Sequence, residues 1–250
     1  DAGHSATYFE TKISSFSSRF FNEIKYNHKR NSIIKISKKT IKLKKEINFY
    51  KNIPSKLKAF FPISLNHHQD EKFLELEYLP YPNLAEVFLF RKIGANRWET
   101  IVKSVFNIYS EFYLNKNFKK FFYNSSHLYS KKLNQRIKAL NEIVEKNISN
   151  KLLKQIINTG IKVNNYNLPS LNATNKKLQN ELKKIEKERP FAFGHGDLCF
   201  NNILIEPISG CIKLIDPKAD SIGNNKIGYV DPLYDLAKLN HSFSCFYDSI

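Results

Sequence analysis

The most constraining feature of this sequence is the segment 194–202, GHGDLCFNN, followed by two short β-branched runs at 203–205 and 212–215. Proline, serine and glycine lie between the two runs and favour a tight turn, so we expect a β-hairpin. Asn202 precedes the first strand and Asp216 follows the second, and antiparallel pairing brings both to the same end of the hairpin. The local pattern therefore predicts two oxygen donors side by side.

Amide and carboxylate oxygens that converge in this way suit Mg²⁺, which takes one or two protein ligands and completes its octahedron with water and phosphate oxygens. Asp197 lies on the loop just before Asn202, where its carboxylate can face an incoming hydroxyl. We interpret this pattern as a site for phosphoryl transfer. We interpret His195 as structural, fixing the loop by hydrogen bonds, because Asp197 already supplies a base.

The string His-Gly-Asp-x-x-x-x-Asn with a later Ile-Asp resembles the catalytic loop and metal segment of the aminoglycoside phosphotransferase and choline kinase family, small-molecule relatives of protein kinases. The resemblance implies that Asp197 is the catalytic base and that Asn202 and Asp216 hold Mg²⁺ against the nucleotide phosphates. Gly196 stands where protein kinases have arginine, and Pro217 stands where they have phenylalanine. Both departures point away from a protein kinase.

The resemblance also implies a two-lobed, protein-kinase-like α+β fold, with a small β-rich N-lobe and a larger helical C-lobe. We place a nucleotide-binding N-lobe at residues 9–78 and a catalytic and acceptor-binding C-lobe at residues 79–250, and we expect the C-lobe to be truncated. Residues 1–8 resemble the exit from a sugar-nucleotidyltransferase domain, which precedes a kinase-like domain in some bacterial envelope-polysaccharide proteins. A trimmed N-terminus explains these residues equally well.

The N-lobe is expected to contain strands at residues 16–24 and 31–37 and a helix over residues 41–51. Lys35 interrupts the apolar run of the second strand, and by resemblance it contacts the nucleotide phosphates. Glu46 is the only acid in the helix, so it is the expected partner that orients Lys35. The alternative for Lys35 is one more surface lysine among many.

The turn expected to cover the phosphates, residues 15–19, contains no glycine, although backbone N–H groups must approach the phosphates closely there. Small serines and a phosphate contact from Arg19 would serve instead. The nucleotide site is therefore less well defined by the sequence than the metal site.

The alternating run 73–79 predicts a strand that ends at prolines. By resemblance this strand leads into the hinge between the lobes, whose backbone binds the adenine of the nucleotide. Glu77, Tyr78 and Leu79 are the residues that we assign to that contact.

Residues 91–190 are predicted to be helical, because apolar side chains recur at spacings of three and four, with turns rich in Lys and Asn between the helices. Asn83 is predicted to cap a helix just before this region. By resemblance the helical region shapes the acceptor site, and its scarcity of Asp and Glu disfavours polycationic aminoglycosides. The two apolar stripes, interpreted as core, are Trp98, Val102, Val105, Tyr109 and Phe112, and Leu133, Ile137, Leu140 and Val144.

A loop is expected at residues 218–226, followed by a helix with Asp231 as N-cap and Pro232 at its first position. The Tyr-Asp-Leu-Ala segment at 234–237 also matches the family, in which this Asp is buried and hydrogen-bonds the catalytic loop. We assign that supporting role to Asp235. The alternative is a first-turn acid that interacts with the helix dipole.

The formal charge is +17, from 40 basic and 23 acidic residues, which raises the question of nucleic-acid binding. The basic residues are mostly lysines spread along the chain, with few arginines for bidentate recognition of phosphate, so we disfavour it. No apolar run approaches the roughly 18 residues of a membrane span, and no signal peptide is apparent. Three scattered cysteines without metal spacing favour a reducing, cytoplasmic setting.

The sequence therefore predicts a Mg²⁺-dependent kinase that moves the γ-phosphoryl group of ATP or GTP to a hydroxyl of a small molecule. The expected acceptor is an envelope precursor of capsule or lipopolysaccharide, such as a sugar or an amino alcohol. One alternative is a non-catalytic nucleotide-binding or scaffold domain. A metal-dependent hydrolase that uses His195, Asp197 and Asp216 would need more histidines nearby.

Overall fold

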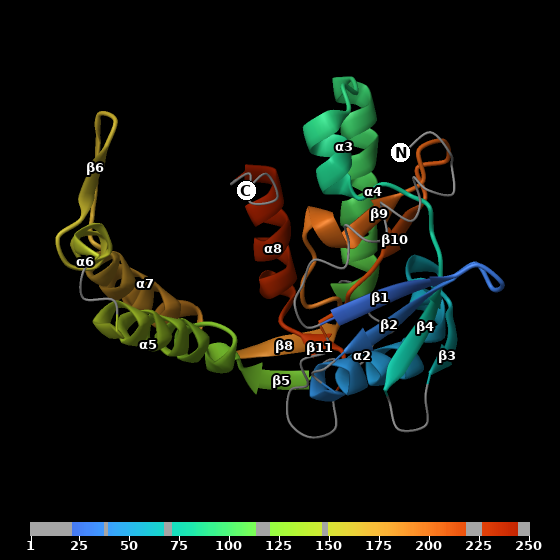
Figure 1. Ribbon diagram of the computed structural model, residues 1–250, viewed down its shortest axis with the longest axis horizontal. Coiled ribbons are helices and arrows are strands. Elements are labelled where there is room, and N and C mark those ends of the chain that lie inside the picture. The colour runs from blue at the N-terminus through green and yellow to red at the C-terminus, as the bar shows by residue number, and fades with distance from the viewer. Residues whose placement is uncertain are drawn as a thin grey trace. The chain divides into compact units, whose positions relative to one another are not determined.

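The computed structural model describes residues 22–37, 40–67, 72–113, 121–146, 150–218 and 227–244. The chain divides into two compact units: unit 1 comprises residues 1–120 and 191–250, and unit 2 comprises residues 121–190. The fold class is α+β, as predicted, with an antiparallel sheet near the N-terminus and mainly helices after it (Figure 1). The lobe boundary expected between residues 78 and 79 stays a prediction.

A four-stranded antiparallel sheet forms the first part of unit 1, in the order β1-β2-β4-β3 (Figure 1). Its strands are β1 Asn22–Asn27, β2 Ser32–Ser37, β3 Ser64–His67 and β4 Phe73–Glu77. The turn between β1 and β2 contains Asn31 at a φ of 48°, a left-handed conformation that asparagine tolerates. The first strand was expected at residues 16–24, and β1 runs past that range; residues 16–21 lie outside the described residues.

Helix α2, Thr40–Asn52, packs against β2 and β4, and the 3-10 helix η1 follows at Ser55–Phe60. Leu43, Ile47 and Tyr50, spaced four and three residues apart, are all buried. The helix expected at residues 41–51 is therefore confirmed, and its apolar side chains recur with a helical period on the buried face.

The remainder of unit 1 is mainly helical, with two small antiparallel sheets. Its elements are the helices α3 Leu84–Phe90, α4 Ala95–Tyr113, η3 Phe200–Asn202 and α8 Pro232–Ser244, and the strands β9 Ile203–Ile205, β10 Ile212–Leu214 and β11 Tyr229–Val230. Strand β8, Glu188–Phe193, belongs to this unit from Phe191 onwards. The predicted hairpin is confirmed as β9 and β10, in which Ile203 pairs with Leu214. Asn83 caps α3 as predicted, because its Oδ1 accepts a hydrogen bond from the Glu86 N–H at 2.8 Å.

One hydrophobic core lies within unit 1 and draws side chains from α2, α4, β8, the hairpin and α8. Phe61 stacks on Phe112 of α4 with ring centroids 6.1 Å apart. The buried face of α4 is rotated slightly from the expected stripe: Ile101 and Ile108 are buried, whereas Val102 and Tyr109 lie at its edge. The loop that carries the predicted catalytic residues therefore lies against a closely packed hydrophobic core.

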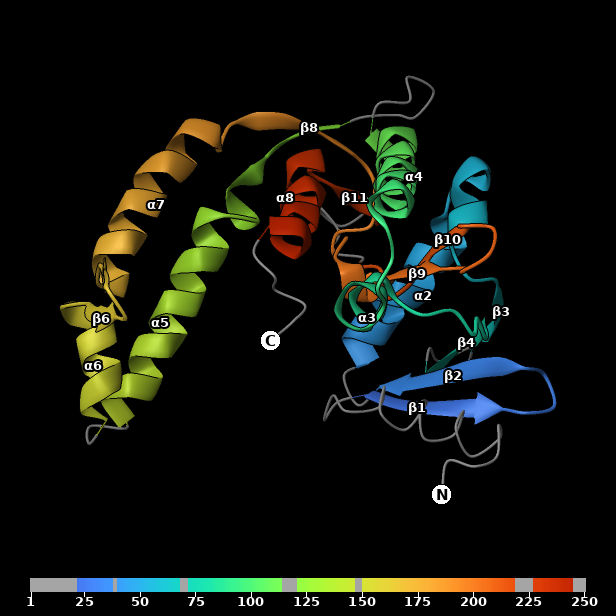
Figure 2. The same ribbon diagram turned by 90° about the horizontal axis from the view of Figure 1, so that it is seen from above.

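Unit 2 is a small helical unit with short strands. Its elements are β5 Phe121–Asn124, η2 Ser125–His127, α5 Ser130–Lys146, α6 Lys151–Asn158, β6 Ile161–Val163, β7 Tyr166–Leu168 and α7 Leu171–Ile185. Helices α5 and α7 run side by side, as the view in Figure 2 shows most clearly. Of the expected stripe on α5, only Val144 is fully buried.

The prediction that residues 91–190 are entirely helical was wrong at β5, at the β6–β7 hairpin and at the start of β8. These strands are three to six residues long, too short for alternation to be distinguished from a helical period. One of the turns rich in Lys and Asn, expected at residues 164–175, instead contains the turn of this hairpin, strand β7 and the start of α7. Asn164 makes the hairpin turn at a φ of 53°.

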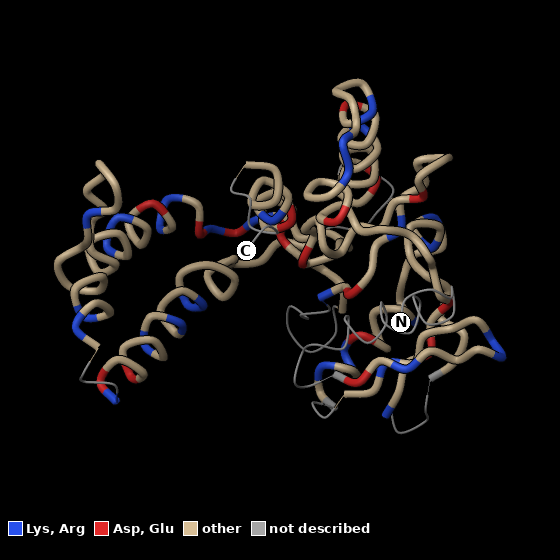
Figure 3. The backbone as a smooth tube through the Cα atoms, turned by 45° about the horizontal axis from the view of Figure 1, so that its top comes forward, with Lys and Arg blue, Asp and Glu red and all other residues tan. Residues whose placement is uncertain are grey.

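Lysine and arginine are distributed over the elements of both units and are interleaved with aspartate and glutamate (Figure 3). The basic charge of the chain is thus not collected into one stripe among the described residues. Within the described ranges, none of the helices combines the length and the apolar character needed to cross a bilayer.

Candidate active site

The segment 194–202 forms the loop between β8 and β9, and its first glycines are required by the backbone. A Cβ atom on Gly194 would collide with the hydroxyl of Tyr113. Gly196 has a φ of 79°, in the left-handed region, and a Cβ there would collide with the carbonyl of Lys218. The loop can therefore follow this path only with glycine at both positions.

Asp235, on α8, holds the backbone of the loop by accepting hydrogen bonds from it. Its Oδ2 accepts hydrogen bonds from the backbone N–H groups of His195 and Gly196, both at 3.0 Å, and its Oδ1 accepts one from Leu198 at 3.3 Å. The hydroxyl of Tyr113 donates to Oδ2 at 2.5 Å. Asp235 is completely buried, so these four donors compensate for the loss of water around its carboxylate.

His195 links the loop to the segment that carries Asp216. Its Nδ1 accepts a hydrogen bond from the Asp197 N–H at 3.2 Å, so its Nε2 carries the proton and donates to the carbonyl of Ile215 at 2.9 Å. The ring is buried and stacks on Phe61, with an interplanar angle of 4°. The imidazole thereby fixes the spacing between the two segments, in line with the structural role expected for it.

Asn202 and Asp216 flank one end of the β9–β10 hairpin, because the Ile215 N–H donates to the Asn202 carbonyl at 3.0 Å. The side-chain Nδ2 of Asn202 donates to the backbone carbonyl of Asp197 at 2.9 Å, which directs its Oδ1 away from that carbonyl. Asp216 has a φ of 53°, which is uncommon for a residue with a Cβ. Such conformations gather at functional sites, where the surrounding structure enforces them.

Lys35, on β2, contacts carboxylates from two distant parts of unit 1. Its Nζ lies 2.7 Å from Oε2 of Glu46 on α2 and 2.5 Å from Oδ1 of Asp216. Burial alone would lower the pKa of Lys35, but the two carboxylates outweigh it and raise the pKa above its ordinary value. Lys35 is therefore a permanent cation that holds Asp216 in place.

Glu46 is the most buried member of this cluster, at 9% side-chain exposure, whereas Asp216 is 40% exposed. Burial raises the pKa of Glu46, the charge of Lys35 opposes that shift, and the charge of Asp216 adds to it. Glu46 thus has the burial expected of a fixed support, and Asp216 has the exposure that a ligand requires.

The predicted hinge begins at Glu77, the last residue of β4, and continues through Tyr78 and Leu79. The N–H of Glu77 donates to Ile63 at 2.9 Å and the N–H of Tyr78 donates to Asn31 at 3.1 Å, both within the sheet region. An N–H contact to adenine would therefore fall to Leu79, which is half-buried. Arg19 and the expected phosphate-covering turn lie outside the described residues.

Two residues near the loop were not identified from the sequence. Lys238 of α8 lies 2.8 Å from Oδ1 of Asp197, and Tyr113 supports Asp235 from α4. Lys238 follows Asp235 by three residues, nearly one helical turn, and that spacing is a signal that could have identified it. Tyr113 is 122 residues away from Asp235 and gave no signal.

The donors present fit a magnesium ion better than a metal that requires several nitrogen or sulfur ligands. Across the described ranges, no three His, Cys, Asp or Glu side chains gather into a metal site. One amide oxygen from Asn202 and one carboxylate from Asp216 suffice for Mg²⁺, because phosphate oxygens and water complete its coordination.

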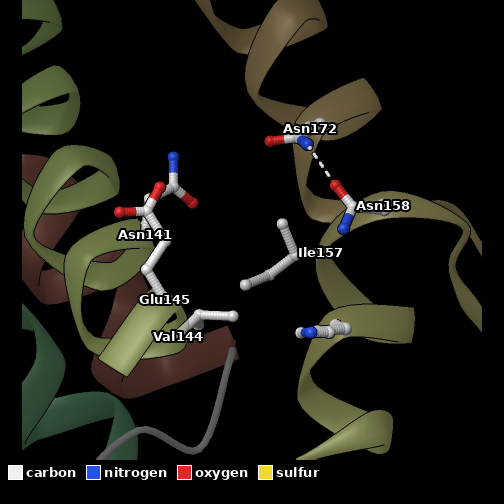
Figure 4. Close-up of a pocket in the computed structure, with 7 residues that line it drawn as sticks. Asn141, Val144, Glu145, Ile157, Asn158 and Asn172 are labelled. Carbon is white, nitrogen blue, oxygen red and sulfur yellow. Dashed lines mark hydrogen bonds between the residues drawn. The ribbon is translucent and has the colours of Figure 1, made fainter. Parts of the chain in front are cut away.

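A cavity of about 590 Å³ lies within unit 2, between α5, α6 and α7 (Figure 4). Asn172 donates to Oδ1 of Asn158 at 3.1 Å across one side of it. None of the residues of the candidate active site lines this cavity. Its lining residues are Asn141, Val144, Glu145, Lys154, Ile157, Asn158 and Asn172.

No family model matches this sequence, and no curated protein matches it either. Among solved structures, the chain resembles APH(2″)-IIa in its ternary complex with streptomycin and ATP, with a TM-score of 0.55 and 15% identity over 93% of this chain and 74% of that chain. The complex of APH(2″)-IIa with gentamicin gives a TM-score of 0.56 and 16% identity over the same shares. At such identities the likeness concerns the fold, and this chain has the protein-kinase-like α+β fold of an aminoglycoside phosphotransferase.

Proposed function

We propose that this protein is a Mg²⁺-dependent phosphotransferase that moves the γ-phosphoryl group of ATP, or GTP, to a hydroxyl of a small molecule. The observation that carries the proposal is the position of Lys35, which contacts both Glu46 and Asp216 although the second carboxylate is 181 residues away. The hydrogen bonds of His195 and Asn202 bring Asp197 to the same segment. The residues proposed as phosphate-binding cation, metal ligands and base thus all belong to unit 1, which supports the proposal.

Each residue has a defined task in this proposal. Lys35 binds the phosphates and Glu46 orients it, while Asn202 and Asp216 hold Mg²⁺. When bound, Mg²⁺ supplies positive charge that neutralises the phosphate oxygens. Glu77 and Leu79 of the hinge, together with Arg19, complete the nucleotide site.

Asp197 orients the acceptor hydroxyl. The acceptor oxygen forms a bond to the γ-phosphorus, the bond from that phosphorus to the bridging oxygen breaks with its electron pair leaving on the nucleoside diphosphate, and the acceptor proton passes to Asp197. Positioning and charge neutralisation provide most of the catalysis.

The acceptor that we propose is a sugar or an amino alcohol used in envelope polysaccharide assembly. The resemblance of the sequence supports this class, and a fused nucleotidyltransferase would tie the product to an activated precursor. The scarcity of acids in the predicted acceptor region is evidence against a polycationic aminoglycoside.

The decisive experiment measures the release of nucleoside diphosphate from ATP and Mg²⁺ in the presence of a panel of hydroxyl compounds. Turnover that depends on both Mg²⁺ and an acceptor is expected. Asp197→Asn should reduce kcat by about 10² to 10⁴, because it removes the base, and should leave ATP binding by calorimetry unchanged.

Glu99→Gln is the matched control, because Glu99 is an exposed carboxylate that pairs with Lys103 on α4. Binding of ATP without turnover on any acceptor would favour the scaffold alternative. Full activity in Asp197→Asn would remove Asp197 from the role of base.

A further inference from the structure

The roles proposed for the active-site residues do not account for the ion pair between Lys238 and Asp197. The ammonium of Lys238 lies 2.8 Å from Oδ1 of Asp197, and both side chains are about a quarter exposed, at 26% and 23%. An ion pair on an open surface contributes little to the stability of the fold. An ion pair that is partly removed from water constrains both of its side chains more strongly. A cation therefore lies directly beside the proposed base.

The two oxygens of the Asp197 carboxylate differ in their surroundings. Oδ1 is buried and lies beside the ammonium of Lys238, in an ion-pair contact without the geometry of a hydrogen bond. Because the side chain as a whole is 23% exposed, we assign Oδ2 as the oxygen that an acceptor hydroxyl reaches. The backbone around Asp197 is fixed as well, because its N–H donates to His195 and its carbonyl accepts from Asn202. The ion pair with Lys238 adds an electrostatic restraint on the carboxylate itself.

Helix α8 contributes charged side chains next to the loop. The sequence of α8 contains one carboxylate, Asp235, which is completely buried and occupied by its four hydrogen bonds to the loop and to Tyr113. Lys238 and His241 are the basic residues of the helix. Lys238 offsets the negative charge of Asp197, so this carboxylate attracts a second cation less strongly than an unpaired carboxylate would.

We propose that Lys238 is a positioning residue for Asp197 and that its charge makes the site select alcohols with no cationic group beside the reacting hydroxyl. This inference rests on the proposed phosphotransferase function and narrows it. An ammonium group next to the accepting hydroxyl would approach Lys238 at short range and be repelled. The acceptor class is therefore neutral or anionic sugars and polyols, and amino alcohols are excluded.

The test compares acceptors that differ in charge and little in shape. The pairs are glucose with glucosamine, and 3,3-dimethylbutan-1-ol with its cationic isostere choline, added to a panel of neutral and anionic sugars. In the wild-type protein, kcat/KM should be at least about tenfold higher for neutral or anionic acceptors than for their cationic counterparts, as expected for like charges a few ångströms apart.

Lys238→Met should lower kcat for neutral acceptors with little change in the KM for ATP. It should also bring the ratio of kcat/KM for neutral acceptors to kcat/KM for cationic acceptors towards one. Lys238→Arg should restore both the rate and the ratio, because it keeps the charge. Lys103→Met is the matched control, since it removes an exposed lysine from the surface pair with Glu99 and should change neither quantity.

A wild-type preference for cationic acceptors, or a ratio unchanged in Lys238→Met, would overturn this inference and leave the phosphotransferase proposal intact. A loss of activity in Lys238→Met with an equal fall in thermal stability and no rescue by arginine would show a merely structural role and also overturn it. Absence of turnover with every member of the panel would overturn the proposed function, and this inference with it.

Discussion

The two units of this protein place their polar groups differently. In unit 1, His195, Asn202 and Asp235 are buried and hydrogen-bonded around one loop. In unit 2, the helices are amphipathic but few of their side chains are buried, and α7 has no buried residue. A buried polar network strengthens its own hydrogen bonds and penalises any unpaired member, so it fixes geometry in a way that an exposed helix surface does not. Substitutions in the buried network of unit 1 should therefore lower activity and stability more than substitutions on the helices of unit 2.

The largest effect is expected from Asp235→Ala. It leaves the donors of His195, Gly196, Leu198 and Tyr113 without their buried acceptor, which should cost about 3 to 5 kcal/mol of unfolding free energy. For a chain of this size that corresponds to a fall in Tm of about 10 °C, measurable by calorimetry. Turnover should also be lost. Glu99→Ala, at an exposed acid, is the control, and equal effects of the two changes would contradict the comparison.

A smaller effect is expected from Tyr113→Phe, which removes one donor to Asp235. The unfolding free energy at neutral pH should fall by about 1 to 3 kcal/mol. Burial, followed by the charge of Asp235, raises the pKa of Tyr113 well above its ordinary value. Above pH 10 the unfolded chain loses this proton while the folded protein keeps it, so the wild-type protein loses stability as the pH rises.

Tyr113→Phe lacks that loss, and its stability should approach that of the wild-type protein as the pH increases from 9 to 11. Denaturant unfolding at several pH values measures the difference. Tyr166→Phe, at an exposed tyrosine of β7, is the control and should leave stability nearly unchanged at neutral pH. A gap between Tyr113→Phe and wild type that widens above pH 10 would refute the assigned cause.

In unit 2, Ser170→Ala should cost about 1 kcal/mol, because Ser170 caps α7 by accepting a hydrogen bond from the Ala173 N–H at 3.2 Å. Hydrogen exchange along α7 should speed up, while exchange in the loop 194–202 should not change. Ser104→Ala, on the exposed side of α4, serves as the control. Faster exchange in the loop would show that a change in α7 affects unit 1, which would contradict the comparison.

The smallest effect is expected from Leu178→Ala on α7, where the leucine is 45% exposed. The change in unfolding free energy should stay within about 0.5 kcal/mol, as is usual for surface positions. Leu57→Ala, at a completely buried leucine of unit 1, is the comparison and should cost about 2 to 5 kcal/mol. Similar losses of unfolding free energy at the two positions would contradict the proposed difference between the units.

Features that depend on neighbouring residues were predictable from the sequence. The hairpin after Asn202, the cap at Asn83 and the period of α2 follow from turn chemistry and from the spacing of apolar side chains, which act over a few residues. The short strands β5, β6 and β7 were missed for the same reason, because three or four residues do not carry a readable period. The resemblance of residues 195–202 and 216 to a known motif supplied expected roles, and these remain predictions to be tested by activity.

The sequence by itself determined the loop, the hairpin and the order of the helices, since each is set by local backbone preferences. Only the tertiary structure decided which polar groups meet: Lys35 with Asp216 across 181 residues, the hydroxyl of Tyr113 with Asp235 across 122, and Lys238 with Asp197. A chain of 250 residues with 40 basic side chains offers each carboxylate many possible partners. Packing of the apolar core selects among them, because burying the wrong pair would leave charges without compensation.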